Sequence, residues 1–335
     1  MNAESASTGP APEGPDRLAA DNGVGGGRRM KAGADADRSR DRVCPEHVPE
    51  TILAPVKAAV MLAGVVLVAT ACSSSSSRPA NPTMAAAQTF RLDGFQPAQA
   101  VAPGRSFEIS FRIAKPGGGT LTAYRTGPGP HTGVHLIVVR DDLSTLVHRH
   151  PPIAADGTIR QRLVLPEGGR YRVLVDVYPR LAGPLRNFQL TGNVDVSGAA
   201  PKRPLPPFRP TEVVDGYRVT LHGAGRIKAV SPTFADVTVT DPTGRPARFS
   251  EWYGALAHAI FFRAGSLDYF HTHVCGAAAS ACASAVGGTR IVGKSTKAGR
   301  LNVGILLPVP GKWRLFLQFK PGAHVVTAPF TLTVR

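Results

Sequence analysis

The chain has 335 residues, 43% of them hydrophobic, and its 39 lysines and arginines outnumber 23 acidic residues to give a net charge of +16. A positive surface favours anionic partners such as lipid headgroups, wall polymers or nucleic acid. No run of basic residues interleaved with aromatic ones indicates a groove for nucleic acid, so a solvated basic surface is the simpler interpretation.

The first 72 residues contain a candidate export signal. Residues 1–56 are rich in Gly, Ala, Asp and Arg without apolar periodicity, so we expect a disordered or wrongly included extension. In the predicted signal segment, 57–72, the apolar run Ala58 to Ala71 is shorter than the roughly 20 residues that span a bilayer. It ends in Val68-Ala69-Thr70-Ala71-Cys72, which resembles a bacterial lipobox with Ala69 in place of the usual leucine.

Lipidation of Cys72 would anchor the mature protein to the outer face of the cytoplasmic membrane. We therefore predict an exported lipoprotein whose partners include the membrane but no nucleic acid.

Composition divides the remaining chain into two domains. Residues 73–88 are rich in Ser, Pro and Ala and predict a flexible tether, and 200–210 contain five prolines and predict a semi-rigid linker. The flanking segments, 89–199 and 211–335, alternate apolar and polar residues in short runs separated by Gly and Pro. We predict an all-β protein with two tandem immunoglobulin-like or cupredoxin-like β-sandwich domains.

The two segments are also repeats of one another. The stretch from His135 to Arg140, followed by His148 and His150, matches the stretch from His258 to Arg263, followed by His271 and His273, at identical spacings. Further on, residues 165–172, LPEGGRYR, align with residues 307–314, LPVPGKWR.

Each repeat predicts a β-hairpin with three histidines on one face. A two-residue turn at Gly265-Ser266 places His258 opposite His273, with His271 on the same face, and pairs Arg263 with Asp268. A turn at Asp142-Leu143 places His135 opposite His150, with His148 on that face.

Neutral imidazoles suit Cu(II), Zn(II) and Ni(II), so we predict a three-histidine metal site in each repeat. A loop of odd length would send His135 and His258 to the opposite face and remove both sites. The competing interpretation is that these histidines bond backbone or carboxylate groups as part of the packing. His131 is a possible extra ligand in the first repeat, and its counterpart in the second repeat is Gly254. His222 and His324 are expected to be structural.

Two cysteines, Cys275 and Cys282, follow the second hairpin. In an oxidising compartment we expect them to form a disulfide. The alternative is that they are thiolate metal ligands beside His273.

An early strand histidine followed by a hairpin closing in His-X-His resembles YtkA-like domains and CopC-type copper carriers. His148-Arg149-His150-Pro151 is similar to a form found in actinobacterial secreted proteins called heavy-metal-binding. The resemblance covers hairpin and architecture only, and this chain lacks the histidine that begins mature CopC. It implies binding and buffering of copper, with zinc the next candidate, by the six hairpin histidines and exchange with an envelope metal-handling protein.

Two other classes of function stay open. Neither hairpin carries the glutamate that a cupin enzyme adds to His-X-His, and no nucleophile elbow or paired carboxylates are found, so we expect a non-enzyme. Blue-copper electron transfer is disfavoured because Met84 is the only methionine after Cys72. A non-catalytic envelope scaffold or protein-interaction module with structural histidines is the main alternative.

Overall fold

The computed structural model describes residues 89–127, 129–182, 187–276, 285–286 and 289–335. The predicted N-terminal extension, the signal segment with Cys72 and the tether lie outside these residues. Every described residue belongs to one compact unit, Ala80–Arg335. We call residues 89–199 the first half and residues 211–335 the second half.

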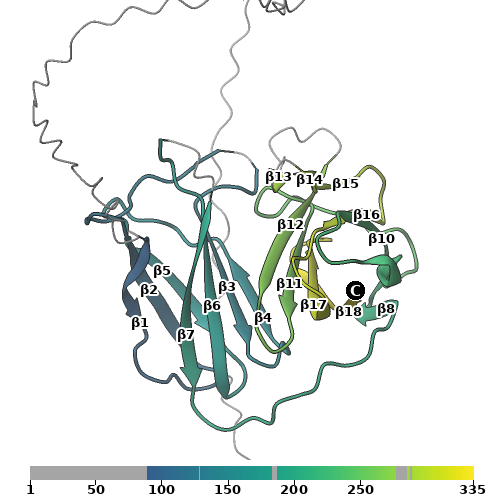
Figure 1. The fold of residues 1–335 in the computed structure, drawn as a ribbon. Coiled ribbons are helices and arrows are strands. Elements are labelled where there is room, and N and C mark those ends of the chain that lie inside the picture. The colour runs from purple at the N-terminus through teal and green to yellow at the C-terminus, as the bar shows by residue number, and fades with distance from the viewer. Residues whose placement is uncertain (1–88, 128, 183–186, 277–284, 287–288) are drawn as a thin grey trace, which may run out of the picture. The chain divides into compact units, whose positions relative to one another are not determined.

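The first half is a sandwich of two antiparallel sheets, one with strand order β1-β2-β5 and one with strand order β4-β3-β6-β7 (Figure 1). Its strands are β1 (Arg91–Gln96), β2 (Ser106–Ala114), β3 (Val134–Arg140), β4 (Leu146–Arg149), β5 (Ile159–Val164), β6 (Gly169–Val177) and β7 (Phe188–Val196).

The second half is built on one nine-stranded sheet of order β18-β17-β11-β12-β15-β16-β10-β9-β8. Only the β12–β15 pairing is parallel, and it joins the two parts of this sheet. The strands are β8 (Thr211–Val214), β9 (Tyr217–His222), β10 (Thr233–Thr240), β11 (Ala257–Arg263), β12 (Tyr269–Gly276), β15 (Gly293–Ser295), β16 (Arg300–Ile305), β17 (Gly311–Phe319) and β18 (Val326–Val334), beside a small β13 (Ala285–Val286) and β14 (Thr289–Arg290) ribbon.

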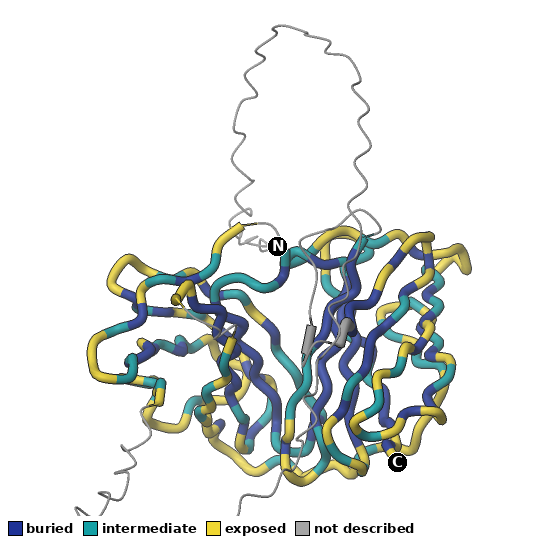
Figure 2. The backbone as a smooth tube through the Cα atoms, turned by 45° about the horizontal axis from the view of Figure 1, so that its top comes forward, coloured by how far each residue is buried: buried dark blue, intermediate teal, exposed yellow. Residues whose placement is uncertain are grey.

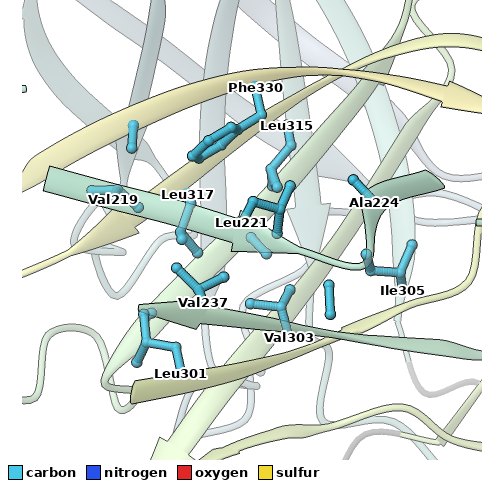
Figure 3. Close-up of a cluster of buried hydrophobic side chains, with 14 of the residues drawn as sticks. Val219, Leu221, Ala224, Val237, Leu301, Val303, Ile305, Leu315, Leu317 and Phe330 are labelled. Carbon is cyan, nitrogen blue, oxygen red and sulfur yellow. The ribbon is translucent and has the colours of Figure 1, made fainter. Parts of the chain in front are cut away.

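The all-β prediction is confirmed for the described residues. The second half forms its sandwich by bending one continuous sheet, whereas the first half has two separate sheets. The core of the second half lies inside the bend, where side chains of β9, β10 and β16 meet those of β17 and β18 (Figure 3). The one helix of the described residues is a short 3₁₀ turn, η1 (Ala224–Arg226), and none is long and apolar enough to cross a bilayer.

Strands β3 and β11 are buried on both faces (Figure 2). In β3, Leu136 and Val138 face the core of the first half, whereas Ile137 and Val139 face the opposite way. Strand β11 repeats this arrangement, with Ile260 and Phe262 facing away from its own core. Because successive side chains of a strand alternate between faces, His135 lies on the same face as Ile137, and His258 on the same face as Ile260.

The outward faces of β3 and β11 form a third core between the two halves. It contains Ile137, Val139, Leu143 and Leu174 from the first half and Ile260, Phe262, Leu267 and Phe316 from the second. Leu205, in the proline-rich segment, packs against the same cluster. The halves therefore share a continuous apolar interface, and the histidine faces of both hairpins turn toward it.

The hairpin registers match the predictions, although the turns are longer than two residues. His258 lies opposite His273, and Leu136 opposite Arg149, which sets His135 opposite His150. The loops span four residues, closed by bonds from Arg140 N to Thr145 O (3.0 Å) and from Arg263 N to Asp268 O (2.9 Å). Two-residue and four-residue loops have the same parity, so the histidines stay on the predicted faces. The predicted Arg263–Asp268 pair is present at 3.6 Å.

Candidate metal centre

The structure brings the six hairpin histidines into one cluster between the halves. His135 in the first half lies 5.4 Å from His271 in the second, and His148 lies 5.0 Å from His258, between ring centroids. The sequence predicted a separate site in each repeat. The two predicted sites form one cluster because the strand faces that carry the histidines pack against each other through the apolar interface.

Three sets of three histidines have ring nitrogens within 4.8 Å of one another. One set, His135, His148 and His150, is the predicted trio of the first repeat. The other two combine both halves: His135 with His271 and His273, and His148 with His258 and His271. The second-repeat trio does not form a set by itself. Any two sets share one histidine, so one ion at a time can hold three imidazoles if each gives one nitrogen.

Two pairs of ring nitrogens lie at a separation that suits either a hydrogen bond between the two imidazoles or a cation shared by them. His148 Nε2 lies 3.2 Å from His150 Nε2, and His258 Nδ1 lies 3.3 Å from His271 Nε2. Two imidazoles on a tetrahedral zinc, with Zn–N bonds of about 2.0–2.1 Å, would have nitrogens about 3.3 Å apart. The pairs therefore fit two ligands of one metal ion.

Hydrogen bonds set which nitrogens are available. His258 Nε2 donates to the Trp252 carbonyl (2.9 Å), which leaves the Nδ1 lone pair toward His271. The Gln318 amide nitrogen donates to Thr327 (3.0 Å), so its oxygen accepts from His148 Nδ1 (3.2 Å). The lone pair of His148 then lies on Nε2, which faces His150. Such bonds to the far nitrogen are typical of metal-binding histidines.

Several other ring nitrogens are buried without a hydrogen bond. Both nitrogens of His135 and of His273, and Nδ1 of His271, have no partner among the described residues. Leaving a buried polar group unsatisfied costs about 1–3 kcal/mol. The competing interpretation, that the histidines serve the packing by bonding backbone or carboxylate groups, fits His258 but not His135 or His273.

Burial keeps the cluster in its neutral, metal-binding form. It lowers the pKa of His258 to about 4 and, with the nearby His258, that of His150 to about 3. The pKa values of His135, His148, His271 and His273 lie well below the ordinary range, because of burial first and neighbouring imidazoles second. At neutral pH the six imidazoles therefore carry lone pairs rather than charges.

His131, a residue of the first half, packs against a histidine of the second half. Its ring meets that of His273 edge-on at 4.8 Å and lies 5.4 Å from Tyr178. It belongs to none of the three sets. The predicted extra ligand thus lies beside His273, a histidine of the opposite half.

A loop of the second half covers the histidines of the first. Tyr253 stacks on His150 at 3.9 Å, and Trp252 meets His148 edge-on at 5.4 Å. Gly254, with a φ of +73°, lies so close to Gly129 that an added Cβ would stand 2.3 Å from the Gly129 carbonyl carbon. Only glycine at 254 allows this contact between loops.

Sequence reasoning missed the buried polar residues beside the cluster, Gln318 and Asp176. They occupy equivalent positions of the repeat, opposite His258 and His135 respectively. Asp176 accepts hydrogen bonds from Tyr178 and Asn187, both at 3.2 Å, and burial raises its pKa to about 6. Extending the repeat alignment four residues past Arg172 and Arg314 would have found both.

The remaining predicted residues lie apart from the histidine cluster or outside the described residues. Cys275 is buried and disulfide-bonded, which removes the alternative of a Cys275 thiolate ligand. Its predicted partner Cys282 lies outside the described residues. His222 is exposed and bonds Thr238 at 3.2 Å, and His324 is exposed.

The family model of DUF8832, a domain of unknown function, matches residues 212–335. That match covers the second half alone. No curated protein matches the chain.

The solved structures that match the chain are remote in sequence and in structure. They include a tetra-tandem repeat in the extending region of a large adhesion protein (10% identity, TM-score 0.23, 74% of this chain and 50% of the other). The bacterial integrin-binding protein invasin has 12% identity and a TM-score of 0.20 over 73% of this chain and 39% of its own. Fibronectin(III)-like modules of Clostridium thermocellum CbhA have 12% identity and a TM-score of 0.19 over 73% and 93%. Similarity at this level carries no argument about fold or function.

Proposed function

We propose that this chain is an exported lipoprotein that binds a divalent transition metal ion at the histidine cluster and buffers or delivers it outside the cytoplasmic membrane. The observation that carries the proposal is the buried set of neutral imidazoles, in which His135 and His273 have no hydrogen-bond partner among the described residues. A metal ion would satisfy these nitrogens and offset the cost of burying them.

Copper is the favoured ion and zinc the next. An all-imidazole donor set suits Cu(II), Zn(II) and Ni(II), and Cu(II) binds nitrogen ligands most tightly of the three. Three histidines leave coordination positions open, which is typical of sites that exchange a ligand rather than of closed structural sites. An open site supports buffering or delivery to an envelope metal-handling partner.

The test is metal content and affinity of the chain, by elemental analysis and calorimetry, beside a variant with His148, His150, His271 and His273 changed to Ala. We expect one Cu(II) or Zn(II) per chain, because the three sets share histidines, and loss of that ion in the variant. Equal metal content in both proteins, or none in either, would instead favour a non-catalytic envelope scaffold.

The export part of the proposal rests on the Cys72 segment and needs its own test. Palmitate labelling and membrane fractionation of cells that express the wild type should place the protein in the membrane fraction. Cys72→Ala should abolish the label and release the protein from that fraction. An unlabelled wild type would contradict the lipid anchor and leave the metal site untouched.

A further inference from the structure

A pocket of about 580 Å³ opens in the first half beside the histidine cluster. This volume is in the range of small-molecule sites. Its walls come from residues 122–126, 132–134, 150–151, 153–155 and 180.

The lining of this pocket is positive. Arg125 and Arg180 contribute to it, and no acidic residue does. The hydroxyl-bearing residues Thr122, Thr126 and Thr132 add further polar groups. Neither guanidinium makes an ion pair or side-chain hydrogen bond among the described residues.

The two arginines stand on paired backbone segments. Arg125 N donates to the Tyr178 carbonyl at 2.9 Å, and Arg180 N donates to the Ala123 carbonyl at 3.0 Å. The bridge between Tyr124 and Pro179 lies between these bonds. The positions of both arginines along the wall are therefore fixed by the backbone.

The pocket and the histidine cluster share a residue. His150 lines the pocket and belongs to the set with His135 and His148. The charge of Arg125 also adds to burial in lowering the pKa of His131 to about 4, so this guanidinium lies within electrostatic reach of the cluster.

We propose that this arginine pocket binds a small oxyanion, a carboxylate or a phosphate, directly beside the histidine cluster. The planar guanidinium of arginine matches both anions with paired hydrogen bonds. An oxygen of the anion then fills a coordination position that three histidines leave open. The site thus takes up its ion together with an anionic ligand. This coupling to the metal rests on the proposed function, whereas the anion site itself does not.

The test uses the metal-free full chain and two probes, inorganic phosphate and succinate, by calorimetry. The variant is Arg125→Ala with Arg180→Ala. The matched control is Arg105→Ala with Arg209→Ala, which removes the same charge at two exposed positions outside the pocket. We expect at least one probe to bind the wild type, at least tenfold more weakly to the pocket variant, and within twofold of the wild type to the control. The preferred probe distinguishes a phosphate site from a carboxylate site.

Equal binding of the probes to wild type and pocket variant, or no binding of either to the wild type, would overturn the pocket. In a second arm, Zn(II) is titrated with and without the preferred probe. The anion should raise Zn(II) affinity in the wild type and in the control but not in the pocket variant, by linkage between the two sites. If neither Zn(II) nor Cu(II), titrated in the same way, binds any of the three proteins, the proposed function is defeated, while the first arm still decides the anion site.

Discussion

The two halves carry the same three histidines at the same spacings but surround them differently. Opposite the first histidine, the first half buries the carboxyl of Asp176 and the second half the amide of Gln318. The first half adds His131, where the second has Gly254. Gln318 reaches across the interface to His148, whereas Asp176 is bonded by Tyr178 and Asn187 of its own half.

This difference shows how a duplicated hairpin becomes one asymmetric centre. The first half contributes a complete set of three histidines, while those of the second half complete sets only with His135 or His148. The second half contributes the loop with Tyr253 and the Gln318 amide, both of which act on histidines of the first half. Each half therefore supplies what the other lacks.

The largest expected effect is a difference in metal affinity between variants of the two halves. Changing His135, His148 and His150 to Gln removes a member of all three sets, and we expect metal affinity to fall more than 100-fold. Changing His258, His271 and His273 to Gln leaves the first-half set, so a weaker site should remain. Calorimetry decides between these outcomes, with circular dichroism to confirm folding. The reverse order of effects would contradict the asymmetry.

The pH dependence of stability sharpens the comparison in the metal-free protein. Folding lowers the pKa of seven histidines, the six hairpin residues and His131, below the unfolded value of about 6.5. Their contribution is present above pH 6.5 and is lost as the pH falls toward about 4. Asp176 has the opposite pH dependence, because folding raises its pKa to about 6. Its protonated carboxyl stabilises the fold at low pH, and this contribution is lost as the pH rises through 6.

The seven histidines outnumber this one carboxyl. We therefore expect the free energy of unfolding to fall by several kcal/mol between pH 7 and pH 5, at up to about 1.4 kcal/mol per pH unit for each histidine. Urea unfolding at pH 5, 6 and 7 measures it. A flat profile would show that the histidines are solvated rather than packed between the halves.

The contact between the loops can be tested by comparing Gly254, which lies in it, with Gly244, which has a similar backbone conformation elsewhere. Gly254→Ala would clash with the Gly129 backbone and hold alanine at a φ of +73°. Gly244→Ala has a similar φ of +82° but open space around the new methyl group. We expect a loss of about 1 kcal/mol for Gly244→Ala and a further 1–3 kcal/mol, roughly, for Gly254→Ala, by urea unfolding. Equal losses would mean that the loops do not meet.

The smallest effect compares the two equivalent polar residues. Gln318→Leu removes the bond that orients His148, and metal affinity should fall roughly 10- to 100-fold. Asp176→Asn changes a group that bonds no described histidine and should alter affinity less than about threefold. A larger effect at Asp176 would place its carboxyl in direct contact with the ion.

Much of the hairpin geometry followed from the sequence, because strand parity and turn position fix which face each histidine occupies. The packing of the two hairpins against each other could not be predicted from the sequence. Its signal was present in the unbroken apolar runs Leu136–Val139 and Ala259–Phe262, since a strand with only one buried face alternates apolar and polar residues. Those runs indicate a second buried face but do not say what covers it, and Gln318 bonds a histidine 170 positions away.

The central claim, one site that uses both halves, is tested most directly by a double-mutant cycle on metal affinity with His135→Ala and His271→Ala. These residues come from opposite halves and belong to one set with His273. Each single variant leaves one set of three histidines intact, whereas the double variant breaks all three sets. The composite site therefore predicts that the double variant loses more affinity than the sum of the two single losses, with a coupling above about 1 kcal/mol. Losses that add to within about 0.5 kcal/mol would contradict it and indicate two independent sites.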